Sequence, residues 1–185
     1  MLIDCSLKVT QAMRLDAQGN ETKALTGHLG THFDVMNKEF PLSFTQRNGI
    51  VFDVSQVKNR DIELKDISLE SVQKDSFVAF YTGFIQEENY GTARYFKEHP
   101  QLSNKLIDAL LLKKVSIIGI DAAGIRRGLE HTSTDQKCAD HNVFVVENLC
   151  NLDLIVNRKS IIHTYPINFE GYTGLPTRVI AEIEA

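Results

Sequence analysis

The segment His28-Leu29-Gly30-Thr31-His32-Phe33-Asp34 contains the residue types best suited to bind a metal ion. In an extended chain, positions 28, 30, 32 and 34 share one face, so two imidazoles and a carboxylate converge. Gly30 adds no side chain between them, which leaves space for a metal ion and a water molecule. Two histidines, one carboxylate and open positions are typical of a catalytic divalent metal. The alternative is a pair of histidines satisfied by neighbours in a glycine-containing loop.

A helical zinc motif does not fit the same segment. That motif needs a glutamate directly after the first histidine, whereas Leu29 follows His28 here. Gly30 and Thr31 are also poor helix formers. The spacing therefore favours an extended chain over a helix.

Glu147 is a second candidate ligand, because it follows the apolar run Val143-Phe144-Val145-Val146. An ionised carboxylate at the end of a buried strand is costly unless it is paired or binds a metal. The alternative is an ion pair with Lys137 or with an arginine.

Several short apolar runs predict the strands that would position these residues. Runs rich in β-branched and aromatic residues occur at 50–54, 77–81, 115–121 and 143–146, and further strands are expected at 2–9, 160–164 and 177–183. An apolar stripe at 102–112 predicts a helix with Ser103 as its N-cap, and residues 16–23 are expected to form a turn. Helices followed by apolar strands indicate an α/β architecture around a central sheet.

Length and composition limit the class of protein. The 185 residues, 43% of them apolar, fit one globular domain spanning 1–185. The net charge of -4 and the pI near 5.9 argue against a nucleic-acid partner. The longest apolar run, 106–112, is too short to span a membrane, and the first residues show no signal-peptide pattern. Three distant cysteines do not suggest a disulfide framework, so we expect a cytoplasmic domain.

The motifs together resemble one known family. HLGTHFD at 28–34 resembles the HxGTHxD core of the metal-dependent cyclase superfamily, which includes bacterial kynurenine formamidases and isatin hydrolases. The stretch 143–149, ending in Glu-Asn-Leu, resembles that family's second ligand motif. Segments 118–122, 166–168 and 174–178 also resemble its later patterns. The resemblance implies a single-domain swivelling β/β/α-type fold, with a central mixed sheet flanked by helices, that assembles as a homodimer or homotetramer.

The resemblance also implies a one- or two-metal site. His28, His32 and Asp34 would hold the first ion, with Asp34 able to bridge to a second ion held by Glu147. The family has a histidine about twelve residues before that glutamate, where this chain has Asp135. His131 and His141 are alternatives, with Asp135 preferred and His131 next. An oxygen-rich second site would favour Mn²⁺ or Mg²⁺ over Zn²⁺.

Two further positions depart from the family pattern. The family motif continues with a proline and then a catalytic histidine, where this chain has Met36 and Lys38. A lysine is protonated at neutral pH, so it could act as a base only if burial beside a metal lowered its pKa. A charged Lys38 could instead stabilise an oxyanion, or it could be a solvated residue near Glu39.

These residues suggest two hypotheses. The first is a divalent-metal hydrolase, with Zn or Mn, that acts on a small amide such as N-formylkynurenine or on a cyclic amide through an activated water. The second is a catalytically impaired relative that binds a metal or a small metabolite without efficient turnover. Weaker candidates are Asp121 as the partner of a ligand histidine and Arg126 or Arg127 as contacts for an anionic substrate.

Overall fold

A computed structural model describes residues 1–20, 23 and 26–184. The strands are β1 (Leu2–Asp4), β2 (His32–Asp34), β3 (Gln46–Asp53), β4 (Phe77–Tyr81), β5 (Ile117–Ile120), β6 (Phe144–Glu147), β7 (Ser160–Thr164), β8 (Gly174–Pro176) and β9 (Val179–Ile183). The α-helices are α1 (Gln11–Ala17), α3 (Phe84–Glu87), α4 (Ala93–Glu98), α5 (Asn104–Lys113) and α6 (His131–Asp140). Short 3₁₀ turns occupy Leu42–Phe44, Leu64–Asp66, Leu69–Ser71, Gly128–Glu130 and Leu152–Leu154.

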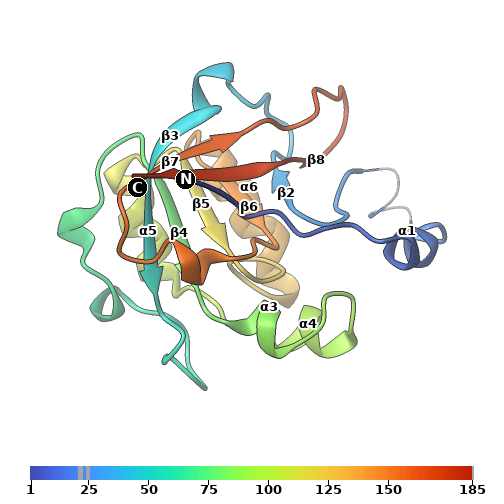
Figure 1. Cartoon of the computed structure of the whole chain (residues 1–185), viewed down its shortest axis with the longest axis horizontal. Helices are drawn as coiled ribbons and strands as arrows, with labels where there is room; N and C mark the ends of the chain where they lie inside the picture. The colour runs from blue at the N-terminus through green and yellow to red at the C-terminus, as the bar shows by residue number, and fades with distance from the viewer. Residues whose placement is uncertain (21–22, 24–25, 185) are drawn as a thin grey trace.

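The described strands form one mixed sheet in the order β1-β9-β7-β3-β4-β5-β6-β2-β8. The four strands β3, β4, β5 and β6 run parallel, and the others pair antiparallel. The sheet curls like a barrel, because the chain leaving β1 pairs with the chain leaving β6 through the bridge between Ser6 and Leu149. The two ends of the chain lie together in the β1–β9 pair (Figure 1).

The central parallel strands β4, β5 and β6 are buried on both faces, as their continuous apolar sequences predict, whereas β3 is mostly half-buried or exposed. Inside the curl, Phe77, Ile117 and Phe144 pack with residues of β7 and β9. On the other face, Val78 and Ile118 pack with α5. The α/β fold with a mixed sheet flanked by helices is therefore confirmed.

Most of the expected elements are present. The strands expected at 50–54, 77–81, 115–121, 143–146, 160–164 and 177–183 correspond to β3, β4, β5, β6, β7 and β9. Helix α5 begins where predicted, since the Ser103 side chain accepts a hydrogen bond from the Leu106 N–H at 3.2 Å. None of the described helices is long and apolar enough to cross a membrane.

Two expectations near the N-terminus were wrong in extent. The strand expected at 2–9 ends at Asp4, because Cys5 and Ser6 turn from β9 towards the end of β6. The turn expected at 16–23 overlaps α1, whose N-cap Thr10 accepts a hydrogen bond from the Met13 N–H. Residues 21 and 22 of that expected turn lie outside the described part of the chain.

Helix α5 offers a matched pair of leucines that tests this packing. Leu110 has 0% of its surface exposed, whereas Leu112 on the same helix is 83% exposed. We expect Leu110→Ala to lower the free energy of unfolding by about 2–5 kcal/mol, because it leaves a cavity between α5 and the sheet. Leu112→Ala should change it by less than about 0.5 kcal/mol. Urea denaturation of both variants measures the difference, and equal losses would contradict this placement of α5.

Candidate metal centre

Strand β2 places two of the candidate ligands, His32 and Asp34, in the sheet itself. It lies between β6 and β8, and its register sets His32 opposite Glu147. Directly opposed residues of an antiparallel pair project their side chains from the same face. Asp34 shares that face because it lies two residues after His32. The sheet register alone therefore brings together His32, Asp34 and Glu147.

His28 reaches the same place from a loop rather than from a strand. The expected extended chain over 28–34 is wrong in its first half, since β2 begins only at His32. Gly30 is present for its backbone, which has a φ of +73°, and a Cβ there would lie 2.6 Å from the Val9 side chain. It therefore leaves room for Val9 and not for a metal. The imidazole of His28 instead fits against Gly174, where a Cβ would lie 2.9 Å from the ring.

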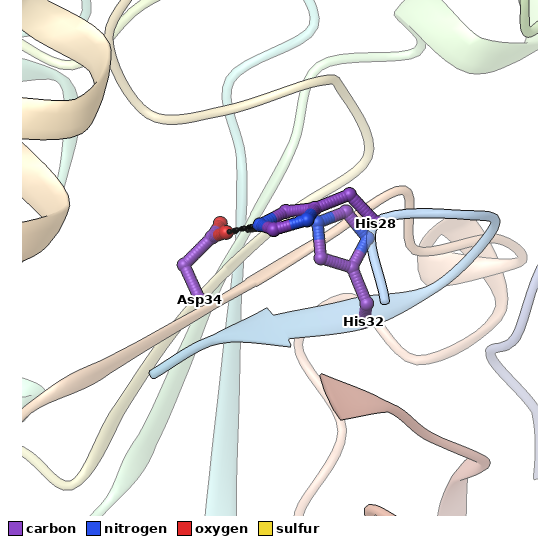
Figure 2. Close-up of side chains that lie close together, drawn as sticks. All are labelled: His28, His32 and Asp34. Atoms are coloured by element: carbon purple, nitrogen blue, oxygen red, sulfur yellow. Dashed lines mark ion pairs between the residues drawn. The ribbon is translucent and has the colours of Figure 1, made fainter. Parts of the chain in front are cut away.

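The imidazoles of His28 and His32 lie side by side near the Asp34 carboxylate (Figure 2), and in both rings Nε2 is the nearer nitrogen. The Nε2 atom of His28 lies 3.1 Å from Asp34 Oδ1, and Nε2 of His32 lies 3.7 Å from the same oxygen. The Nδ1 atoms are engaged elsewhere: that of His28 lies 3.0 Å from Thr26 Oγ1, and that of His32 donates to the Gly30 carbonyl at 2.9 Å. This arrangement suits ligation, because a second contact at Nδ1 fixes the ring while Nε2 faces the ion.

A second group adjoins the first and shares Asp34 with it. It contains Asp34, His131, Asp135 and Glu147, whose ligand atoms lie within 4.8 Å of one another. His131 and Asp135 are one turn apart on α6, so both face the sheet. The Nε2 atom of His131 lies 3.2 Å from Asp135 Oδ2 and 3.3 Å from Glu147 Oε1. The structure thus brings two of the three alternatives for this position, Asp135 and His131, to the same place.

The three carboxyl groups of these clusters are buried, and this perturbs their ionisation. Burial and the neighbouring charge of Asp34 raise the pKa of Glu147 and of Asp135 well above the usual range. Burial would also raise the pKa of Asp34, but its contacts with His28 and His32 outweigh that effect and lower it. Close carboxylates in a buried site cannot all ionise without a compensating positive charge.

No lysine or arginine within the described residues forms an ion pair with these three carboxyl groups. Lys137, the alternative partner of Glu147, pairs with Asp108 instead. Among the described residues, His32 Nε2, Asp34 Oδ2 and Glu147 Oε1 are buried and form no hydrogen bond, although Glu147 Oε1 lies near His131 Nε2. Buried polar atoms of this kind need an explanation, and one or two cations among them would provide it. The residues present therefore fit a divalent metal.

Other residues singled out in the sequence lie in different surroundings. The Nζ atom of Lys38 forms an ion pair with Asp140 at 2.9 Å, and its side chain is 39% exposed. His141 caps the end of α6 through the Lys137 carbonyl. Asp121 accepts hydrogen bonds from the backbone N–H groups of Thr82 and Gly83, so it holds the turn after β4 rather than an imidazole. Arg126 pairs with Asp61 and Glu130.

The family of this chain follows from comparison of its sequence with known families. Residues 3–126, more than half of the chain, match the Cyclase family, which is described as "Putative cyclase". The chain belongs to the Cyclase family. The match includes the segment 28–34 and ends before α6 and β6, so it does not cover His131, Asp135 or Glu147. No curated protein sequence matches the chain.

Solved structures share the fold of this Cyclase-family member over nearly the whole chain. A potential metal-dependent hydrolase with cyclase activity has a TM-score of 0.77 and 23% identity, covering 98% of this chain and 96% of its own. A predicted metal-dependent hydrolase from Bacillus stearothermophilus has a TM-score of 0.75, 22% identity and coverages of 98% and 97%. Isatin hydrolase A from Labrenzia aggregata, bound to benzyl benzoate, has a TM-score of 0.74, 18% identity and coverages of 98% and 93%. At these identities the likeness shows the fold.

Substitution of Glu147 separates the metal's contribution to stability from that of the fold. In metal-free protein we expect Glu147→Gln to leave Tm unchanged or to raise it, because the amide, unlike the carboxyl group, cannot become negatively charged beside Asp34. For the unaltered protein, saturating Mn²⁺ should raise Tm by about 5–10 °C, and most of that gain should be lost in Glu147→Gln. Differential scanning calorimetry with and without chelator measures both values.

Glu182→Gln is the matched control for this substitution. Glu182 also pairs with an imidazole, that of His163 at 3.0 Å, but at the surface. It should leave the gain from Mn²⁺ intact. A full gain in Glu147→Gln would exclude Glu147 from the ligand set.

Proposed function

We propose that this chain is a metal-dependent hydrolase that cleaves the amide bond of a small molecule. The observation that carries the proposal is the convergence of three buried carboxyl groups and the Nε2 atoms of three histidines with no lysine or arginine paired to those carboxyls in the described chain. The names of similar structures, metal-dependent hydrolases and isatin hydrolases among them, support the same reaction class. N-formylkynurenine and cyclic amides are the substrate types that we propose, from the resemblance to formamidases and isatin hydrolases.

The ligand sets divide between two ions that share Asp34. His28, His32 and Asp34 would hold the first ion, and a second would lie among Asp34, Glu147, Asp135 and His131. A divalent ion in such a site lowers the pKa of a bound water and polarises a carbonyl group. The second group has three carboxylates and a single histidine, so it favours Mn²⁺ or Mg²⁺, whereas the two imidazoles of the first group also suit Zn²⁺.

His131 is the residue best placed to move a proton if only the first ion is bound. Its Nε2 atom contacts both Asp135 and Glu147, and its side chain is 34% exposed, the most of any residue in the two groups. This position, in contact with the site and partly open to solvent, is one from which a general base could act. Lys38 remains our proposal for oxyanion stabilisation, although its ion pair with Asp140 would have to break for it to act.

Assembly as a homodimer or homotetramer also stays a prediction.

The second candidate function is a family member that binds a metal or a metabolite with little turnover. The ion pair of Lys38 with Asp140 favours it, because the position of the family's catalytic histidine is then occupied by an engaged, half-exposed ammonium group. Metal analysis of the purified protein, followed by assays on formyl-anilides and cyclic imides with Mn²⁺ or Zn²⁺, distinguishes the two functions. Turnover that a chelator abolishes supports the hydrolase, whereas stoichiometric metal without turnover supports the binding protein.

Two substitutions test the second ion. We expect Glu147→Ala to remove one equivalent of metal and to lower turnover about tenfold or more, while His28 and His32 keep the first ion. Asp135→His should raise the affinity for Zn²⁺, because it replaces an oxygen ligand by an imidazole. Inductively coupled plasma analysis and zinc titration measure these changes. Unchanged metal content and rate in Glu147→Ala would rule out a two-metal enzyme.

Lys38→Met tests the proposed oxyanion role separately. A lower kcat with unchanged metal content would support that role, and an unchanged rate would refute it. Asp140→Asn is the matched control, because it frees Lys38 without removing its charge. It should leave the rate unchanged or raise it.

A further inference from the structure

Gly30 lies between the two histidines in the chain. Its backbone N–H and its carbonyl each form a hydrogen bond with a side chain from a distant part of the sequence. The Gly30 N–H donates to the Tyr90 hydroxyl at 3.1 Å. The Gly30 carbonyl accepts from the Asn148 side-chain amide at 2.9 Å and from His32 Nδ1 at 2.9 Å. Because the carbonyl can only accept, the proton of the neutral His32 ring lies on Nδ1 and the lone pair on Nε2.

Asn148 is itself fixed by a third side chain. The Tyr95 hydroxyl donates to Asn148 Oδ1 at 2.8 Å, which leaves the Asn148 amide nitrogen directed at Gly30. Asn148 directly follows Glu147 and has a φ of +58°, a conformation that asparagine tolerates better than most residues. The Asn148 carbonyl also accepts from the Thr31 hydroxyl at 2.7 Å. The loop of the histidines is therefore tied to the strand end that carries Glu147.

Both tyrosines come from the segment between β4 and α5, more than 50 residues away in sequence from Gly30. Tyr95 has 0% of its surface exposed and packs with Phe84 and Ala123 in a small apolar cluster, against which Tyr90 also packs. Burial raises the pKa of both hydroxyl groups, so they stay protonated. A neutral, rigidly packed hydroxyl group keeps its partner in one orientation.

We propose that Tyr90, Tyr95 and Asn148 form a clamp on Gly30 that positions His28 and His32 and so sets the affinity for the first metal ion. The inference rests on the proposed metal site but adds residues that contact no ion. The clamp holds the backbone between the two imidazoles from the N–H side and from the carbonyl side. It therefore reduces the freedom that the histidines would otherwise lose on binding.

The test is the dissociation constant of Mn²⁺ and of Zn²⁺ in metal-free protein, measured by calorimetric titration of the full chain. Tyr95→Phe and Tyr90→Phe keep the aromatic rings and remove only the hydroxyl groups. We expect each to weaken binding of the first ion by about 10- to 100-fold, as loss of an outer hydrogen-bond partner does in other metal sites. The double variant should lose less than the product of the single losses, because Tyr90 directly and Tyr95 through Asn148 restrain the same glycine.

Two controls separate positioning from stability. Tyr81→Phe removes a hydroxyl group that donates to the Gln86 side chain at 2.9 Å, away from Gly30, and should leave both dissociation constants unchanged. Leu110→Ala destabilises the apolar cluster between α5 and the sheet and should also leave both dissociation constants unchanged when titrated well below its Tm. If Tyr95→Phe does not fold, Tyr90→Phe decides the result.

The outcomes distinguish the clamp from the proposed function. Weaker metal binding in the clamp variants but in neither control supports the clamp. Unchanged dissociation constants in the clamp variants, with tight binding by the unaltered protein, overturn the clamp alone. No metal binding by the unaltered protein overturns the metal site and the clamp together.

Discussion

The mutual repulsion of three buried carboxyl groups is the interaction on which the rest of the site depends. Ligand atoms of Asp34, Asp135, Glu147 and His131 lie within 4.8 Å of one another, and within the described part of the chain the basic groups in contact with the three carboxyls are imidazoles. Burying one unpaired carboxylate is already costly, and burying three without cations would oppose folding. A bound divalent ion would offset that cost, so we expect metal binding to stabilise this protein.

The sheet holds the candidate ligands in fixed relative positions. Two candidate ligands come from β2 and one from β6, which pair directly, so their relative positions follow from backbone hydrogen bonds. Helix α6 precedes β6 in the chain and supplies His131 and Asp135 from one face. Only His28 lies on a loop, and Gly174 together with the hydrogen bonds at Gly30 restrains it. The candidate site therefore combines residues on regular elements with one loop residue, His28, that is held by further contacts.

Much of this arrangement could be predicted from the sequence because its signals are local. The segment 28–34 contains the two histidines and the aspartate within seven residues, and the apolar run before Glu147 predicts a buried strand that ends in a charge. The role of Gly30 could not be predicted, since its φ angle and its contact with Val9 depend on the folded loop. Helix α6 has few apolar residues, so no periodic stripe indicated that His131 and Asp135 share a face. The contacts of Tyr90 and Tyr95 join residues more than 50 positions apart and leave no spacing pattern.

The most direct test of the metal centre is an anomalous diffraction experiment on crystals of this protein soaked in Mn²⁺. We predict an anomalous peak within bonding distance of His28 Nε2, His32 Nε2 and Asp34, with a second peak between Asp34 and Glu147 if two ions bind. A map without a peak at these residues, in crystals where both imidazoles still contact Asp34, would contradict the account.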